Sequence, residues 1–375
     1  MEDKEDKYIF IAEWYDNISG LLRKFYFTFF TIDETIEMYD MINKRLFLRR
    51  TPCSTVRQSD IYLGSILNVM SRQIKLVDYA NLATRQKLDI TIERTFGLLK
   101  FPALQKLGYI MDTIYRNDLT ISNARMLYLS ENESRVLLKE NEKEIQYSHD
   151  IEDLMSNPSV VLEIRGVNAI SKWMKITDVK ILEENEMTIC GNLAELKPFC
   201  YSPSSRSRIE KEIEIFFPEA KTIHCTTAKF TNCTCCIIKP HIVRKGISGQ
   251  IIQALIDANF NITALEMVYI DYTSAEDFYE VYKGVVAEYS EMVKQLSEGP
   301  CIALEISSPE CEESMVTKLR QFVGPSDPEI ARHLRPTTLR ARFGESSAKN
   351  AVHCTDLPQD GLLEVEFIFK ILARI

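Results

Sequence analysis

The feature that most constrains the fold of this chain is an internal repeat that fills most of its length. Four segments of residues 91–220 recur in the same order in residues 233–375: 95–100 as 234–239, 119–126 as 260–267, 158–164 as 300–306, and 212–217 as 364–369. Similarity in a fixed order is the signature of one structural unit present twice. The sequence therefore predicts two homologous domains, which we call the first copy and the second copy. The linker between them (218–232) is short, which favours docking.

Each copy alternates apolar strands with amphipathic helices. In the second copy, residues 249–256 place four apolar side chains at helical spacing, as in a helix with one buried face. The order strand, helix, strand, helix, strand predicts an α+β fold of the ferredoxin-like kind, with helices covering one face of a sheet.

Residues 1–90 have a different residue pattern, and we call them the N-terminal module. Short runs rich in aromatic and β-branched residues are separated by turn-forming residues, which predicts a β-rich, barrel-like or curled sheet. The expected strands are 8–15, 23–30, 35–39, 45–49, 61–70 and 73–78. One basic cluster, Lys44, Arg45, Arg49 and Arg50, is either a solvated face or a contact for an acidic partner surface.

The charge of the chain excludes some classes of partner. Its 45 Lys+Arg against 54 Asp+Glu give a net charge of −9. No overall basic field exists to attract nucleic acid or an anionic membrane, so neither is expected as a partner. No signal-type core follows the mixed-charge residues 1–7, and no stretch approaches the roughly 18–20 apolar residues of a spanning helix. We expect an intracellular, cytoplasmic protein.

The ten cysteines are spread along the chain without a regular framework, which favours reduced thiols over disulfides. The cluster Cys233, Cys235 and Cys236, with His224 and Cys225 upstream, has a zinc-like composition but lacks the two-residue spacing of a zinc knuckle. The alternative is an apolar strand that uses cysteine as a small hydrophobic residue. No metal site is predicted.

The candidate reactive residue is His353, near the end of the second copy. It lies in a turn-rich segment that favours exposure of the ring. A neutral imidazole is a good nucleophile toward phosphorus, and Glu364 can fix its tautomer by accepting a hydrogen bond. An isolated histidine is more often structural. Here, however, the second copy also contains residues of types that bind phosphate oxygens: Lys239, Arg320, Ser326, Arg340, Asn350 and Thr355. The combination predicts phosphoryl transfer.

The motif Asn350-Ala-Val-His353-Cys-Thr355-Asp356 resembles the Asn-X-X-His-X-Ser/Thr-Asp signature of the nucleoside diphosphate kinases, and residues 233–375 are similar to that family. The resemblance implies that His353 takes the γ-phosphate of a nucleoside triphosphate as phosphohistidine and that Glu364 orients its ring. The implied nucleotide-binding residues are Lys239, Tyr279, Arg320, Ser326, Arg340, Asn350 and Thr355. Magnesium is implied only together with the nucleotide.

Both copies depart from the family pattern. In the second copy, Pro240-His241-Ile242 stands in place of Pro-Asp-Gly, residues 287–290 replace the base-stacking segment, Ser326 replaces threonine, and Cys354 replaces a glycine. Whether this copy turns over is left open. The first copy keeps Lys100 but has no histidine in residues 196–203, where Cys200 stands near the expected place; its one histidine is His149. We expect the first copy to be catalytically dead.

Four motifs of the N-terminal module, at residues 10–16, 36–40, 47–51 and 69–73, are similar to the DM-ten domain of ciliary proteins. A DM-ten module followed by two kinase-like copies resembles a ciliary branch of the nucleoside diphosphate kinases. The resemblance implies a structural microtubule inner protein of the axoneme in cilia or flagella, with tubulin and other inner proteins as partners. The alternative is an active nucleoside diphosphate kinase. Family members form symmetric oligomers, and here the two copies are expected to form a pseudo-dimer within one chain.

Overall fold

The computed structural model describes residues 6–16, 19–89, 92–138, 147–177, 200–203, 205–218, 226–307 and 314–372. The chain forms two compact units. The module unit consists of residues 1–91 and 269–300, and the repeat unit consists of residues 92–268 and 301–375. Residues 269–300 of the second copy therefore group with the N-terminal module, which no pattern in the sequence predicted.

The module unit is built on a curled six-stranded antiparallel sheet with the order β4-β3-β2-β1-β6-β5. Its strands are β1 (Lys7–Asp16), β2 (Leu21–Phe30), β3 (Thr35–Asp40), β4 (Arg45–Pro52), β5 (Ile66–Val69) and β6 (Arg72–Tyr79). Alternate residues of β2, Phe25, Phe27 and Phe29, are fully buried and build the inner face. The β-rich prediction is confirmed.

One predicted strand of this module is wrong in its first half. Residues 61–70 were expected to be extended throughout, but β5 begins only at Ile66. A 3-10 turn, η1 (Gln58–Asp60), precedes this stretch, and Gly64 adopts a φ of +89°, a left-handed conformation that interrupts a strand. The module ends with helix α1 (Leu82–Asp89).

The part of the module unit contributed by residues 269–300 is helical. It contains α10 (Tyr272–Phe278), the 3-10 turn η5 (Glu280–Tyr282) and α11 (Tyr289–Ser297), and α10 contacts α11. Asp271 begins α10 with its side chain accepting a hydrogen bond from the Ser274 amide at 2.7 Å, as an N-cap residue does. We call residues 272–297 the helical hairpin.

The repeat unit contains an eight-stranded sheet with the order β10-β7-β9-β8-β12-β13-β11-β14. The first copy supplies β7 (Glu93–Leu99), β8 (Leu119–Leu127), β9 (Ser159–Gly166) and β10 (Cys200–Tyr201). The second copy supplies β11 (Cys233–Ile238), β12 (Asn261–Tyr269), β13 (Pro300–Ser307) and β14 (Val352–Cys354). The strand order of one copy is the mirror order of the other about the β8–β12 junction, and the α+β prediction is confirmed.

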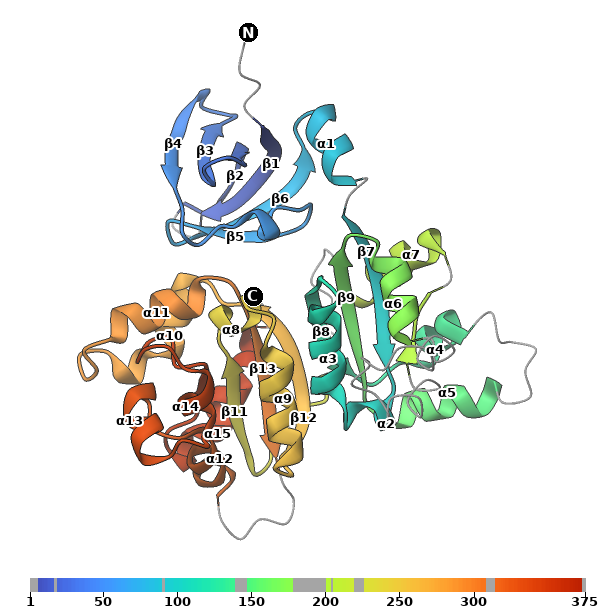
Figure 1. The fold of residues 1–375 in the computed structure, drawn as a ribbon, viewed down its shortest axis with the longest axis vertical. Helices are drawn as coiled ribbons and strands as arrows, with labels where there is room; N and C mark the ends of the chain where they lie inside the picture. The colour runs from blue at the N-terminus through green and yellow to red at the C-terminus, as the bar shows by residue number, and fades with distance from the viewer. Residues whose placement is uncertain are drawn as a thin grey trace. The chain divides into compact units, whose positions relative to one another are not determined.

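Helices connect these strands in both copies (Figure 1). In the first copy they are α2 (Phe101–Leu104), α3 (Leu107–Arg116), α4 (Glu131–Leu138), α5 (Tyr147–Ser156), α6 (Ala169–Thr177) and α7 (Arg206–Phe216). In the second copy they are α8 (Pro240–Arg244), α9 (Ser248–Asp257), α12 (Met315–Val323), α13 (Pro328–Leu334), α14 (Leu339–Phe343) and α15 (Gly361–Glu366), followed by the π-helical turn η7 (Phe367–Ile371).

The expectation that helices cover one face of the sheet is wrong for the first copy. Trp173 of α6 packs in a core with Val160 and Leu162 of β9. Val161, which points to the opposite face, packs in a second core with residues of α4, α5 and α7, among them Phe216. Because β9 is apolar at consecutive positions instead of alternating ones, both of its faces must be covered.

The two copies dock through equivalent residues. Arg125 of β8 pairs with Glu266 of β12, and each is the seventh residue of its repeat segment. The Arg125 Nη2 atom lies 2.7 Å from Glu266 Oε1. Gly108 and Gly249, each the second residue of its helix, bring α3 and α9 together: a Cβ atom on Gly108 would lie 2.3 Å from the Gly249 carbonyl oxygen. Such self-matched contacts define a pseudo-twofold axis, so the expected intrachain pseudo-dimer is confirmed.

Candidate functional site

The reactive centre predicted at His353 is assembled on the edge of the repeat-unit sheet. His353 lies on β14 opposite Ile237 of β11 and is 5% exposed. The expected exposure of its ring is therefore wrong, because the residue lies on a strand paired with β11. Its Nε2 atom is 2.8 Å from Glu364 Oε2 on α15. A carboxylate can only accept, so Nε2 carries the proton and the neutral ring keeps its lone pair on Nδ1. The ring is therefore held in the tautomer in which Nδ1 is the nucleophile.

Thr355 completes this arrangement. Its hydroxyl donates to the same Glu364 oxygen at 2.8 Å and accepts from the Cys235 amide at 3.1 Å. The threonine is fully buried, so its two hydrogen bonds hold the carboxylate against the strand that carries His353. Thr355 positions Glu364 in this structure, a role more indirect than the phosphate contact expected for it.

Two cations are buried beside this centre. Lys239 is 1% exposed and donates from Nζ to the Ala348 carbonyl at 2.8 Å. Arg340, on α14, donates from Nη2 to the Val352 carbonyl at 3.1 Å and from Nη1 to the Gly324 carbonyl at 3.1 Å. Burial and the neighbouring Arg340 lower the pKa of Lys239 to about 7. Within the described residues neither cation is paired with a carboxylate. Two buried positive groups without a carboxylate partner among the described residues favour an anionic ligand.

Asn350 supplies a buried polar atom suited to a ligand. Its Nδ2 atom donates to the Ser326 carbonyl at 3.0 Å, but Oδ1 meets no hydrogen-bond donor among the described residues. Buried acceptors are normally satisfied, so this one favours a hydroxyl donor from outside the chain. Ser326 joins the site through its carbonyl group. The next residue after Asn350, Ala351, has a φ of +73°, a strained conformation of the kind that clusters at functional sites.

Two of the predicted site residues remain, Arg320 and Tyr279. Arg320, on α12, forms an ion pair with Asp356, and both side chains are partly exposed. Tyr279 lies in the helical hairpin of the module unit, where its ring is fully buried beside Phe278 and Tyr282. The repeat unit thus brings together His353, Glu364, Thr355, Lys239, Arg340, Asn350 and the Ser326 carbonyl, whereas Tyr279 belongs to the other unit.

Two of the departures from the family pattern take buried positions. Cys354 is 1% exposed, and its sulfur lies 3.8 Å from Arg340 Nη2. His241 is 9% exposed, and burial lowers its pKa to about 4, so it is neutral at pH 7. The aspartate expected there has been replaced by an uncharged group, which leaves the cations near it less compensated.

The first copy places a tyrosine where the second has its histidine. Tyr201 pairs with Leu98 as His353 pairs with Ile237, and Leu98 and Ile237 are both the fourth residue of their repeat segments. The interpretation that Cys200 stands at the histidine position is therefore wrong by one residue. The shift could not be found from sequence because it depends on the register in which Cys200 and Tyr201 pair with β7.

Tyr201 also keeps the histidine's partner. Its hydroxyl donates to Glu212 Oε1 at 2.7 Å, and Glu212 is the repeat equivalent of Glu364. Arg208 donates from Nε to the same oxygen at 2.9 Å. Burial raises the pKa of the neighbouring Cys200 to about 12, so that thiol is a poor nucleophile at neutral pH. A neutral phenol tied to an Arg–Glu pair cannot replace the imidazole, which agrees with a catalytically dead first copy. His149 has no described side chain.

The cysteine cluster lies in the sheet. Cys233, Cys235 and Cys236 are buried on β11, and burial raises the pKa of all three thiols. No group of three His, Cys, Asp or Glu side chains suited to a metal ion occurs among the described residues. None of the described helices combines the length and apolar character needed to cross a membrane.

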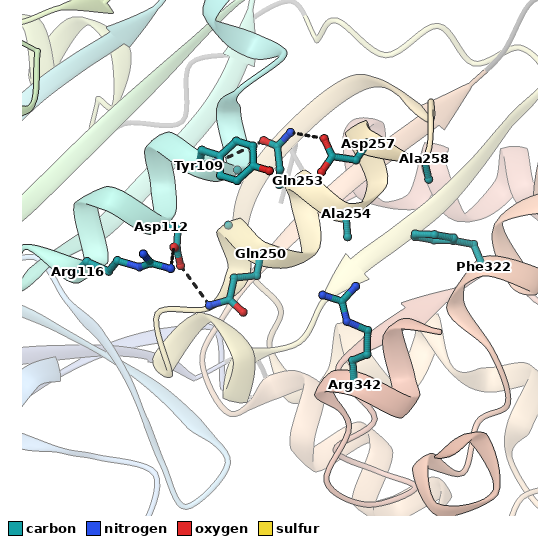
Figure 2. A pocket seen from close by; sticks show the side chains of 12 residues that line it. Tyr109, Asp112, Arg116, Gln250, Gln253, Ala254, Asp257, Ala258, Phe322 and Arg342 are labelled. Carbon is teal, nitrogen blue, oxygen red and sulfur yellow. Dashed lines mark hydrogen bonds and ion pairs between the residues drawn. The ribbon is translucent and has the colours of Figure 1, made fainter. Parts of the chain in front are cut away.

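A groove of about 710 Å³ is lined by residues of α3 and α9 together with Phe322 of α12 and Arg342 of α14 (Figure 2). Five of its polar side chains pair with one another. Asp112 holds Arg116 at 2.7 Å and accepts from Gln250 at 3.2 Å, and Gln253 donates to Asp257 at 2.8 Å. None of the predicted site residues lines the groove, which belongs to the docking surface of the two copies.

The sequence of this chain is similar to those of several known proteins. The family model described as "Nucleoside diphosphate kinase" matches residues 93–222 and 232–372. The "Nucleoside diphosphate kinase homolog 7" of Mus musculus is 41% identical over 99% of this chain and 95% of its own length. The nucleoside diphosphate kinase of Aquifex aeolicus is 35% identical over 38% of this chain and 96% of its own. A crystal structure of the Aquifex aeolicus enzyme covers 37% of this chain and 94% of its own at 34% identity, with a TM-score of 0.34.

Proposed function

The chain belongs to the nucleoside diphosphate kinase family, and from that premise we propose that it is a structural protein of ciliary or flagellar doublet microtubules, built on two kinase-like copies of which the second has retained a nucleotide site. The observation that supports the structural role is the replacement of the imidazole by Tyr201 in the first copy, with Glu212 retained. The first copy has kept the fold but lacks the reactive histidine. A domain kept without its reactive residue favours a role in which its surface binds other proteins.

The partners proposed for this role are tubulin and other proteins inside the doublet. The resemblance of the N-terminal module to the DM-ten domain of ciliary proteins supports an axonemal location in the cytoskeleton. The basic residues Lys44, Arg45 and Arg49 are exposed on the module and suit an acidic surface such as that of tubulin.

Imaging tests this proposal. The chain is tagged in a ciliated cell and located by super-resolution microscopy, and its association is measured by co-pelleting with purified doublets. Signal along the axoneme that resists salt extraction supports an inner position. A diffuse cytoplasmic signal together with no co-pelleting would contradict the structural role.

The second candidate function is nucleoside diphosphate kinase activity at His353, and the 2.8 Å contact of Nε2 with Glu364 favours it. In this reaction Nδ1 attacks the γ-phosphorus of a nucleoside triphosphate, the bond from that phosphorus to the β-phosphate oxygen breaks, and the nucleoside diphosphate leaves. The phosphohistidine then transfers its phosphoryl group to a second nucleoside diphosphate. Lys239 and Arg340 would neutralise phosphate oxygens, and Asn350 Oδ1 would accept a sugar hydroxyl.

Magnesium fits this site only with the nucleotide. Among the described side chains near His353 are two cations and an amide, and the carboxylate of Glu364 already binds the imidazole and Thr355. Such a set suits a metal ion held by phosphate oxygens, to which it would supply charge neutralisation.

Labelled ATP separates the two candidates. Acid-labile label on the protein, abolished by His353→Ala and chased by an added nucleoside diphosphate, would establish turnover. Binding of nucleotide without label on the protein would leave a structural protein with a nucleotide site.

A further inference from the structure

The glutamate that orients His353 lies on a helix near the end of the second copy. Helix α15 continues directly into the turn η7, because the residues at their junction keep right-handed helical conformations. We call residues 361–371 the Glu364 helix. Its first turn contributes little to the core, since Leu362 and Leu363 are 41% and 61% exposed. The position of Glu364 therefore depends on contacts at other points of this helix.

Both ends of the Glu364 helix meet the same short segment of the chain. At its start, a Cβ atom on Gly361 would lie 2.6 Å from the Cys233 carbonyl oxygen, so only glycine allows this approach. At its end, Lys370 Nζ lies 4.0 Å from the centroid of the Phe230 ring. An ammonium group is attracted to the face of an aromatic ring. Residues 230–233, where the linker enters β11, thus hold the helix at both ends.

A buried carboxylate fixes Phe230. Glu305 on β13 is 0% exposed, and its Oε1 atom accepts from the Phe230 amide at 2.7 Å. Its Oε2 atom accepts from the Lys229 amide at 2.6 Å and from the Thr263 hydroxyl at 2.5 Å. Phe230 has a φ of +55°, which a phenylalanine adopts only where its surroundings impose it. Because a buried carboxylate needs these donors, the linker backbone and the Phe230 ring are held in place.

The first copy lacks this arrangement. Glu163 is the repeat equivalent of Glu305, but it accepts from the side chains of Asn123 and Arg165, each at 2.6 Å. Pro218 stands at the position equivalent to Lys370. The contact of an ammonium group with the linker is thus made by the copy that has the histidine. Phe230 also precedes residues 232–372, which match the family model, so the contact is additional to the family pattern.

We infer that Phe230 is a positioning residue for the reaction of His353: its ring, fixed by Glu305, holds Lys370 and with it the helix that carries Glu364. The inference rests on the kinase activity given above as the second candidate function. One oxygen of Glu364 must stay within hydrogen-bond distance of His353 Nε2. A shift of the helix would lengthen that contact and release the ring toward its other tautomer.

Phe230→Leu in the full chain is the test. Leucine keeps an apolar side chain but removes the ring face on which Lys370 lies. In a chain labelled with nitrogen-15 in its histidines, nuclear magnetic resonance of the His353 ring is expected to show more of the tautomer protonated on Nδ1. The His353 signals are assigned by their loss in His353→Gln. Phosphohistidine formation from labelled ATP is expected to slow about two- to fivefold, the range for one partly exposed cation–π contact.

Nucleotide affinity separates positioning from a general loss of packing. The two buried cations and Asn350 are held by carbonyl groups of residues 324–352, so the Kd for a non-hydrolysable ATP analogue with magnesium is expected to be unchanged in Phe230→Leu. Phe230→Tyr keeps the aromatic face and is expected to restore the wild-type rate and ring signals. A slow rate in both variants would contradict the role of the ring.

Tyr128→Leu is the matched control. Lys229, the neighbour of Phe230, places its Nζ atom 5.8 Å from the centroid of the Tyr128 ring in the first copy. The substitution removes a contact of the same kind from the same linker, but this contact does not involve the Glu364 helix. We expect the His353 ring signals and the labelling rate to be those of the wild type.

Lys370→Met removes the other partner of the contact. The Lys370 side chain is 42% exposed, so the variant is expected to fold even if Phe230→Leu does not. It should slow labelling as Phe230→Leu does, and the double variant should be no slower than either single one, as for two residues that act through one contact. Independent, multiplying effects would overturn the inference.

The outcomes separate the inference from the function on which it rests. A wild-type chain that is labelled, with a Phe230→Leu chain that matches it in rate and ring signals, overturns the inference and leaves kinase activity standing. A wild-type chain that takes no label overturns kinase activity. In that case a changed tautomer in Phe230→Leu still supports the hold of Phe230 on Glu364, and an unchanged one overturns it.

Discussion

At the scale of single residues, the two copies differ in the side chains that bind the equivalent glutamates, Glu364 and Glu212. In the second copy Glu364 binds an imidazole and a threonine, and in the first Glu212 binds a phenol and an arginine. The glutamate of the first copy is therefore paired with an arginine, whereas the glutamate of the second copy has hydrogen-bond partners but no arginine. Reactivity depends on the partner, since a phenol tied to an ion pair is a weak nucleophile at neutral pH.

Glu364→Gln tests the orienting role. Glutamine keeps the size of the side chain but loses the charge that fixes the His353 tautomer, and we expect phosphohistidine formation to fall about 10- to 100-fold, as for lost orienting partners of other histidines. The rate is measured by single-turnover labelling with ATP.

Glu366→Gln is the control for this change. It lies two residues further along α15 and pairs with Lys370 at the surface. We expect an unaltered rate. A Glu364→Gln chain that labels as fast as the wild type would remove the carboxylate from the reaction.

Lys239→Met tests the buried charge through its pH dependence. The pKa of Lys239 is lowered from 10.5 to about 7 by burial and Arg340. Below pH 7 the lysine is charged in both states, and folding carries the full cost of burying it. Between pH 7 and 10.5 only the unfolded chain holds the proton, so stability rises with pH.

The expected result is a nucleotide-free Lys239→Met chain that is more stable than wild type by about 1–4 kcal/mol at pH 6, with an advantage that shrinks toward pH 10. Melting temperatures across this pH range measure it. Lys245→Met, at an exposed lysine, is the control and is expected to show a small effect without this trend. An advantage that does not change with pH would contradict the assignment.

At the scale of elements, the docking of the copies combines a close helix contact with a charge pair. Gly108 and Gly249 allow α3 and α9 to touch, and Arg125 faces Glu266 where β8 meets β12. In a symmetric dimer of either copy alone, arginine would face arginine or glutamate would face glutamate. The pair therefore favours the union of unlike copies over self-association.

A charge swap tests this selectivity. Arg125→Glu is expected to lower the free energy of unfolding of the repeat unit by about 1–3 kcal/mol, because the pair is largely but not fully buried. The double variant Arg125→Glu with Glu266→Arg should recover most of that loss. Urea denaturation followed by near-UV circular dichroism provides the measurement.

Arg135→Glu supplies the comparison, since Arg135 pairs with Glu131 at the surface, where both side chains are more than half exposed. Its expected effect is below about 0.5 kcal/mol. Failure of the double variant to recover stability would show that the docking surface does not depend on the charge pair.

At the scale of the whole molecule, the two compact units do not follow the order of the module and the two copies along the sequence. The helical hairpin of the second copy belongs with the N-terminal module, and the rest of that copy belongs with the first. The second copy is therefore continuous in sequence but divided between the two units.

Localisation in cells tests whether shape alone is sufficient. We expect a His353→Ala chain to incorporate into axonemes as the wild type does, because the substitution removes the nucleophile and leaves the surfaces intact. Fluorescence intensity along cilia in a knockout background measures incorporation. The Arg125→Glu chain, with its two copies destabilised, is expected to incorporate less. Loss of incorporation in His353→Ala would make the chemistry part of the assembly.

Sequence alone determined the repeat, the α+β class, the β-rich module, and the group Lys239, Arg340, Asn350, His353 and Glu364, because these depend on local periodicity and on a short motif. It failed where the outcome depends on distant pairing. The register that puts Tyr201 in the histidine's place is set by hydrogen bonds to β7, an earlier strand of the chain. The contact of the Phe230 ring with Lys370 joins positions far apart in the sequence. Only tertiary structure brings such residues together, since each hydrogen bond is decided by geometry that no local pattern encodes.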